Sequence, residues 1–272
     1  MIVDANCQFF GADETGPMLR AMDAAGIDRT LLAASLEGAV IPGREKALRG
    51  VGNTECAAAV AAHPDRFIGC FHLNPLQPDA RQIVERYAGE GFRAVKLIPA
   101  EGYFVDDPRF YELFDLIQDK GLAAVVYCGQ VAMTLAHDGG KRRALNSAFG
   151  YPMRLDAPSR LFPRIRFVIV HMGFPFLFEA WSVHHANKNV FLDISGSGAY
   201  FDGLPVGYAA VGGPAFIPLD FDKVVWGSDN AAGLSAARAV ADTYVKLMGC
   251  TDDAQRARVF GANAAKLLGL AD

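Results

Sequence analysis

Three features common in other protein classes are missing from this 272-residue chain. No apolar run approaches the roughly 18 residues that span a bilayer, so the sequence predicts no membrane helix. The five cysteines form no CxxC pair, and their odd number, without a leader-like N-terminus, favours buried thiols and a cytoplasmic location. Neither sign of charge dominates, since 26 basic residues meet 30 acidic ones. This balance argues against nucleic acid or a membrane as partner and leaves a small molecule.

What the chain does have is a recurring pattern of short apolar runs. They are continuously apolar and mostly β-branched, as expected of strands buried on both faces of a parallel sheet. The eight runs begin at Ile2, Arg29, Phe67, Ala94, Ala123, Arg166, Val190 and Lys223. Helical periodicity lies between them, for example over residues 80–91, 106–121 and 236–247. The alternation predicts an α/β fold with one domain over residues 1–272, a single, distorted (β/α)8 TIM barrel.

Two long segments interrupt this alternation, at about residues 130–155 and 195–222. Both follow the ends of predicted strands, where barrel enzymes build their sites, so they are candidate lids or substrate walls. The first contains a basic run at residues 141–143, which suits a solvated helix face equally well. His184 and His185 fall in a helical stretch and are expected to be exposed.

Polar residues stand where the apolar runs end, which in a barrel is the catalytic face. They are Asn6 and Gln8 in the first run, His72 in the third, Lys96 in the fourth, Tyr127 in the fifth, His171 in the sixth, Asp193 in the seventh, and Asp229 with Asn230 in the eighth. Residues two apart share a strand face, so Asn6 and Gln8 point the same way. His171 and Asp229 have the residue types of an acid–base pair, while each alone also suits a structural role.

Lys96 is flanked by apolar residues. A buried cation costs several kcal/mol unless it is paired, so we expect a carboxylate or an anionic ligand beside it. A purely structural alternative is a salt bridge across the barrel to Asp193 or Asp229.

A zinc site is not expected from this set of residues. Zinc prefers imidazole and thiolate ligands, whereas Asn6, Gln8, His171 and Asp229 offer one imidazole, one carboxylate and two weak amide donors. We therefore expect no metal and no other cofactor.

Several stretches follow one another in an order and spacing that resemble a known family: VDANCQFF, GFRAVKLIP, APSRLFPRIRFVIVHMG, NVFLDISG, VVWGSDN and GANAAKLLGL. The chain resembles the amidohydrolase superfamily, in the branch of aminocarboxymuconate-semialdehyde decarboxylase and the pyrone-dicarboxylate lactonases. The resemblance covers nearly the whole chain and implies a TIM barrel. It implies that His171 positions or activates water and that Asp229 binds metal or acts as general base.

The same resemblance puts Asn6, Gln8 and Tyr127 where the family carries metal-binding histidines. Their loss favours the lactonase type, which is understood to work without a metal. The implied enzyme is a metal-independent hydrolase of a small carboxylated or cyclic ester, with Asp229 as general base. His171 and Lys96 would be catalytic groups that stabilise the oxyanion. The substrate-binding residues would be Asn6, Gln8, Tyr127, His72 and Asn230.

Two alternatives stay open. The first is a decarboxylase of the same branch, with one hard divalent cation held by Asp229, His171 and an amide oxygen. The second is a ligand-binding protein that keeps the barrel and has lost catalysis. The habits of the branch suggest a homodimer in each case.

Overall fold

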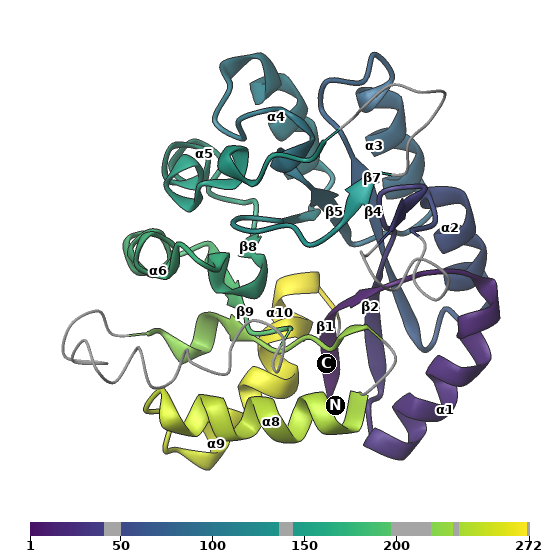
Figure 1. Ribbon diagram of the computed structural model, residues 1–272, viewed down its shortest axis with the longest axis vertical. Coiled ribbons are helices and arrows are strands. Elements are labelled where there is room, and N and C mark those ends of the chain that lie inside the picture. Colours follow the sequence, from purple (N-terminus) through teal and green to yellow (C-terminus); the bar gives the residue numbers. More distant parts are fainter. Residues whose placement is uncertain (41–49, 136–143, 197–218, 231–233, 271–272) are drawn as a thin grey trace.

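Parallel strands form a ring with helices outside it in the computed structural model (Figure 1). The structure describes residues 1–40, 50–135, 144–196, 219–230 and 234–270, so the basic run at 141–143 and most of the second insert lie outside the described residues. The strands of the ring are β1 (Val3–Gln8), β2 (Arg29–Ala33), β4 (Phe67–Leu73), β5 (Ala94–Leu97), β6 (Ala123–Val126), β8 (Phe167–Ile169), β9 (Val190–Asp193), β10 (Val224–Val225) and β11 (Asp229–Asn230). A separate antiparallel pair consists of β3 (Ala39–Val40) and β7 (Thr134–Leu135).

The ring closes because its last segment is shared between two neighbours. β10 pairs with β9, whereas β11, a few residues further along the same segment, pairs with β1. Between them, the carbonyl of Trp226 accepts a hydrogen bond of 2.8 Å from the amide of Ala5. The order β10-β9-β8-β6-β5-β4-β2-β1-β11 is therefore a circle, with β10 and β11 as two parts of an eighth strand. The predicted barrel is confirmed, and each of the eight predicted runs contains a strand of it.

Helices surround the ring. They are α1 (Thr15–Ala25), α2 (Asn53–Ala62), α3 (Ala80–Gly89), α4 (Tyr111–Asp119), α5 (Asp156–Leu161), α6 (Leu177–Ala186), α8 (Leu234–Leu247), α9 (Asp253–Ala257) and α10 (Asn263–Leu268). A 3-10 turn that begins at Pro108 leads into α4, and Asp107 caps it by accepting a hydrogen bond from the amide of Arg109. Of the described helices, none is both long and apolar enough to cross a membrane.

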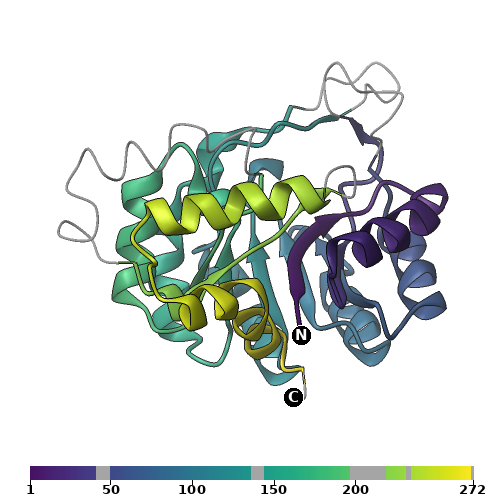
Figure 2. The ribbon, with the colours of Figure 1, turned by 90° about the horizontal axis from the view of Figure 1, so that it is seen from below.

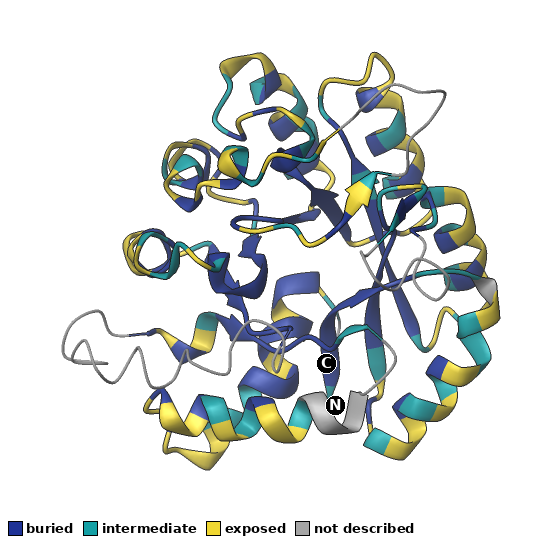
Figure 3. Ribbon diagram, in the orientation of Figure 1, coloured by how far each residue is buried: buried dark blue, intermediate teal, exposed yellow. Residues whose placement is uncertain are grey.

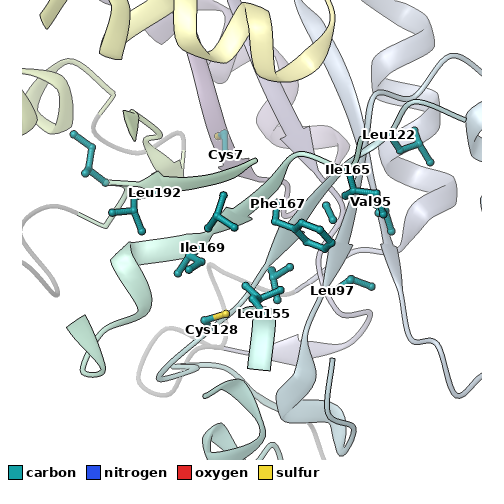
Figure 4. Packing of buried hydrophobic residues seen from close by; sticks show 14 of the residues in the cluster. Cys7, Val95, Leu97, Leu122, Cys128, Leu155, Ile165, Phe167, Ile169 and Leu192 are labelled. Atoms are coloured by element: carbon teal, nitrogen blue, oxygen red, sulfur yellow. The ribbon is translucent and has the colours of Figure 1, made fainter. Parts of the chain in front are cut away.

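Apolar side chains pack in two shells. Outward-facing strand residues such as Leu97 and Ile169 meet the helices in the larger cluster (Figure 4). Inward-facing residues such as Ala94 and Val125 fill the ring itself, and α10 adds Leu267 to this inner cluster. In Figure 2, α10 lies near the N-terminus, at the end of the ring where β1 begins. Most residues of the ring strands are buried, whereas the helices expose their outer faces (Figure 3). All five cysteines are free and buried, as expected.

Candidate active site

An irregularity in β1 turns both of its amide side chains into the mouth of the barrel. Asp4 pairs with Thr30 of β2, but the next pair is Cys7 with Leu32, so β1 has one residue more than its neighbour over this stretch. Such a bulge re-aims the side chains beside it. Ala5 therefore faces the inner cluster while Asn6 and Gln8, both buried, still reach polar partners inside the ring.

Gln8 is the hub of the mouth. Its Nε2 donates to the hydroxyl of Tyr127 at 2.7 Å and to Oδ1 of Asp229 at 3.2 Å. Its Oε1 accepts from Nζ of Lys96 at 3.2 Å and, at 3.5 Å, from the hydroxyl of Ser35. One amide group thus connects residues of four strands or strand ends.

Lys96 lies inside the ring with none of its surface exposed. Its ammonium is 4.7 Å from the centre of the Tyr127 ring, a cation–π contact, in addition to its bond with Gln8. Within the described residues, no carboxylate oxygen comes within 4 Å of Nζ, so the salt bridge considered as an alternative is not formed. Desolvation lowers the pKa of Lys96 to about 8, although the charge of Asp229 acts in the opposite direction.

His171 and Asp229 face each other, with Nε2 of the histidine 3.7 Å from Oδ1 of the aspartate. Both have left-handed backbone conformations, with φ of 52° and 66°, and Met172 beside His171 has φ of 50°. Non-glycine residues rarely adopt this region, and such strain collects at functional sites. The imidazole stands edge-on to the Tyr127 ring, with 5.4 Å between ring centres. The structure therefore brings the two members of the predicted acid–base pair together.

A second polar group at the end of β9 supports this pair; its Asp193 was expected at this face without an assigned role, and its Ser195 was not predicted. Asp193 and Ser195 are both fully buried. The Ser195 hydroxyl donates to Oδ2 of Asp193, and Nδ2 of Asn6 reaches both side chains at 3.0 Å. Nδ1 of His171 lies 2.9 Å from Oγ of Ser195. Burial raises the pKa of Asp193 above its ordinary range, while the neighbouring His171 and these hydrogen bonds act against that shift.

His72 is held apart from this network by a partner of its own. Its Nε2 lies 2.7 Å from Oε2 of Glu101, a largely buried carboxylate that also accepts from Asn74 at 3.1 Å. His72 is the register partner of Lys96, so the two side chains share the inner face of neighbouring strands. Asn230 is half-buried on β11, opposite Gln8. Substrate contacts of His72 and Asn230 stay predictions.

The expectation for His184 is wrong, whereas His185 is exposed as predicted. His184 is fully buried because its Nδ1 meets the carbonyl of Val190 at 3.0 Å and its Nε2 meets the amide of Asp220 at 3.2 Å. Both nitrogen atoms of this imidazole, which lies on the inner face of α6, therefore have hydrogen-bond partners in the backbone. Helical periodicity alone did not reveal these partners.

A family model described as amidohydrolase matches residues 3–270. The chain belongs to the amidohydrolase family. No curated protein matches it.

Solved structures share the fold of this amidohydrolase at low identity. A probable 2-pyrone-4,6-dicarboxylic acid hydrolase from Acinetobacter baumannii, with citric acid bound, has a TM-score of 0.69 at 13% identity and covers 98% of this chain and 99% of its own. An uncharacterised TIM-barrel protein from Bordetella bronchiseptica has a TM-score of 0.68 at 20% identity over 93% and 82%. A dihydroxybenzoic acid decarboxylase from a Polaromonas species, with manganese and 2-nitroresorcinol bound, has 0.62 at 14% over 99% and 97%.

The donor set of this amidohydrolase is poor in the imidazole and carboxylate ligands that transition metals prefer. Among the described residues, no three His, Cys, Asp or Glu side chains gather closely enough to share a metal. Asn6 and Gln8 on β1, and Tyr127 directly after β6, have neutral side chains. The ammonium of Lys96, 3.2 Å from Oε1 of Gln8, would also repel a cation placed against that amide.

Proposed function

We propose that this amidohydrolase is a metal-independent hydrolase that opens small carboxylated cyclic esters. The observation that carries the proposal is the Gln8 amide, which joins the ammonium of Lys96 to the carboxylate of Asp229. Ester hydrolysis needs a base for the attacking water and a positive or donating group for the carbonyl oxygen. Here the two groups stand on either side of one side chain.

In this mechanism Asp229 takes a proton from water as the oxygen attacks the ester carbon. Lys96 and the hydroxyl of Tyr127 stabilise the negative charge that develops on the carbonyl oxygen. The ring C–O bond then breaks, and the proton held by Asp229 passes to the departing oxygen. His171 faces Oδ1 of Asp229 and assists both transfers. Water and ester are consumed and a ring-opened acid is formed, with no other reactant.

The substrate class has two supports. The first is the positive charge of Lys96 within the mouth, which favours a substrate that carries carboxylates. The second is the Acinetobacter neighbour, which is described as a dicarboxylic acid hydrolase and has citric acid bound. Both are consistent with an anionic ligand.

The experiment measures turnover of 2-pyrone-4,6-dicarboxylate and of pyrones that lack one or both carboxylates. Asp229→Asn is expected to lower kcat by about 10²–10⁴, the usual contribution of a positioned acid or base, with an unchanged circular dichroism spectrum. Asp115→Asn, at an exposed position on α4, is the matched control and should keep full activity. Undiminished turnover in Asp229→Asn would contradict the proposal.

A metal-dependent decarboxylase is the second candidate, and one atom favours it. Oδ1 of Asn6 is buried and, among the described residues, has no hydrogen-bond partner, so it is an oxygen that a hard cation accepts. Mass spectrometry of protein purified without chelator or histidine tag separates the candidates. We expect far less than one equivalent of metal and no effect of chelators. One equivalent of manganese, magnesium or zinc, with activity lost on chelation, would favour the decarboxylase.

A further inference from the structure

With Asp193 ionised, the hydrogen bonds around Ser195 leave one arrangement of protons. A serine hydroxyl has one hydrogen and two acceptor lone pairs. The hydrogen goes to Oδ2 of Asp193, and one lone pair accepts from Nδ2 of Asn6, which can only donate. The second lone pair therefore accepts from Nδ1 of His171 at 2.9 Å.

The backbone of Ser195 gives the same answer independently. Its carbonyl oxygen lies 3.1 Å from Nδ1 of His171. Because a carbonyl oxygen cannot donate, this contact is a hydrogen bond only when the proton is on Nδ1. Two oxygen atoms of one residue thus select the same tautomer of the histidine.

We propose that Asp193 and Ser195 are positioning residues that hold His171 as its Nδ1–H tautomer and turn Nε2, as a proton acceptor, towards Asp229. Nε2 and Oδ1 of Asp229 are then two acceptors 3.7 Å apart, which is too long for a direct hydrogen bond. A water molecule that donates to both matches this arrangement. The inference rests on the proposed function only in giving that water its role as nucleophile.

Asp193 fixes the direction of the Ser195 hydroxyl. Its Oδ1 accepts from the amide of Ser195 at 2.8 Å, so in Asp193→Asn the side-chain oxygen stays on this backbone donor. The new amide nitrogen then takes the place of Oδ2 and donates to the Ser195 hydroxyl. The hydroxyl hydrogen is displaced towards Nδ1 of His171, which favours the Nε2–H tautomer in competition with the Nδ1–H form that the Ser195 carbonyl selects.

The test is a long-range 1H–15N correlation spectrum of 15N-histidine-labelled protein in alkaline buffer, which reports the tautomer without any substrate. His184 is an internal reference, because its Nδ1 faces a carbonyl and its Nε2 faces a backbone amide, and this fixes the Nδ1–H form. We expect wild-type His171 to match His184. In Asp193→Asn its Nδ1 resonance should shift towards the unprotonated position, while His184 stays unchanged and shows that the fold is intact.

Ser195→Ala is the matched variant. It removes the hydroxyl but keeps the backbone carbonyl, so His171 should remain the Nδ1–H tautomer. A wild-type His171 in the Nε2–H form, or an unchanged His171 spectrum in Asp193→Asn, would overturn the inference. Neither result depends on turnover, so each is distinct from a failure of the Asp229→Asn experiment, which tests the proposed function itself.

Discussion

The ammonium of Lys96 places a charge where the fold would be more stable without one. The side chain is fully buried, and its partners are an amide oxygen and an aromatic ring instead of a carboxylate. Replacing a buried ionic group by an apolar one of similar size is often stabilising by about 1–4 kcal/mol. Lys96→Met should therefore unfold at higher urea concentration than wild type, while its kcat falls by about 10²–10³ through loss of an oxyanion donor. Lys120→Met, at an exposed position, should leave both unchanged.

The pH dependence of the free energy of unfolding shows whether the charge of Lys96 causes the difference in stability between wild type and Lys96→Met. Desolvation lowers the pKa of Lys96 from 10.5 to about 8 in the folded protein. Between these values the unfolded chain holds a proton that the folded chain has released, so wild-type stability rises with pH relative to Lys96→Met. The stability gap between the two proteins should narrow by about 3 kcal/mol from pH 8 to 10.5. Urea unfolding across this range measures the gap, and a constant gap would show that the buried charge is not its cause.

The segment between β10 and β11 approaches β1 so closely that it leaves no room for a side chain at Gly227. A Cβ on Gly227 would lie 2.7 Å from Cβ of Asn6 and within 3.0 Å of its backbone N and O atoms. Gly227→Ala should lower the free energy of unfolding by about 1–3 kcal/mol through overpacking and displace Asn6. Gly89→Ala, at the end of α3 with open space around it, is the control and should be neutral or slightly stabilising. Equal effects of the two substitutions in thermal unfolding would show that the close approach of Gly227 to β1 does not limit the size of this residue.

Strands and helices could be predicted because their signal is local. Each of the eight apolar runs contains a strand of the ring, and the helical periodicity over residues 106–121 located the segment that contains α4. The bulge in β1 and the left-handed backbone of His171 could not be predicted, because distant contacts impose them. For the same reason the sequence suggested that Asp229 and His171 share one end of the barrel but not that they face each other.

The site residues that were not predicted differ in how strong a signal the sequence contains for them. Ser195 follows Asp193 by two, the same spacing as Asn6 and Gln8, so alternation along a strand end contained a usable signal. Glu101 lies in a 3-10 turn after β5, where no periodicity indicates what it contacts. The burial of Lys96 was predicted from its apolar neighbours. Its partners, however, come from other strands and were not.

For the molecule as a whole, Asp4 joins the first strand to the last. Its Oδ1 accepts from the amide of Ser228 at 2.9 Å, and its Oδ2 accepts from the Ser228 hydroxyl at 2.6 Å. Burial is the largest influence on this carboxyl and raises its pKa from 3.8 to about 7, against the effect of these hydrogen bonds. From pH 4 to 7 the folded protein thus holds a proton that the unfolded chain has lost, and stability falls as pH rises.

Asp4→Asn should remove this dependence. The amide keeps an oxygen for the backbone of Ser228 and cannot ionise. Wild-type stability relative to the variant should decline by about 4 kcal/mol between pH 4 and 7 and then level off. Urea unfolding at a series of pH values measures both curves, and the variant cancels the contribution of other groups such as Asp193. Parallel curves would show that Asp4 titrates normally.

The hydrogen bonds between Asp4 and Ser228 join residues 224 positions apart, and this separation has a consequence during synthesis. A ribosome adds Asp4, in β1, 224 positions before Ser228, which precedes β11. Until then one side of β1 is an uncovered strand edge, a template on which other chains assemble. Asp229 directly follows Ser228, so the nascent chain keeps this edge uncovered while the intervening residues are added and acquires its complete mouth only when β11 has emerged.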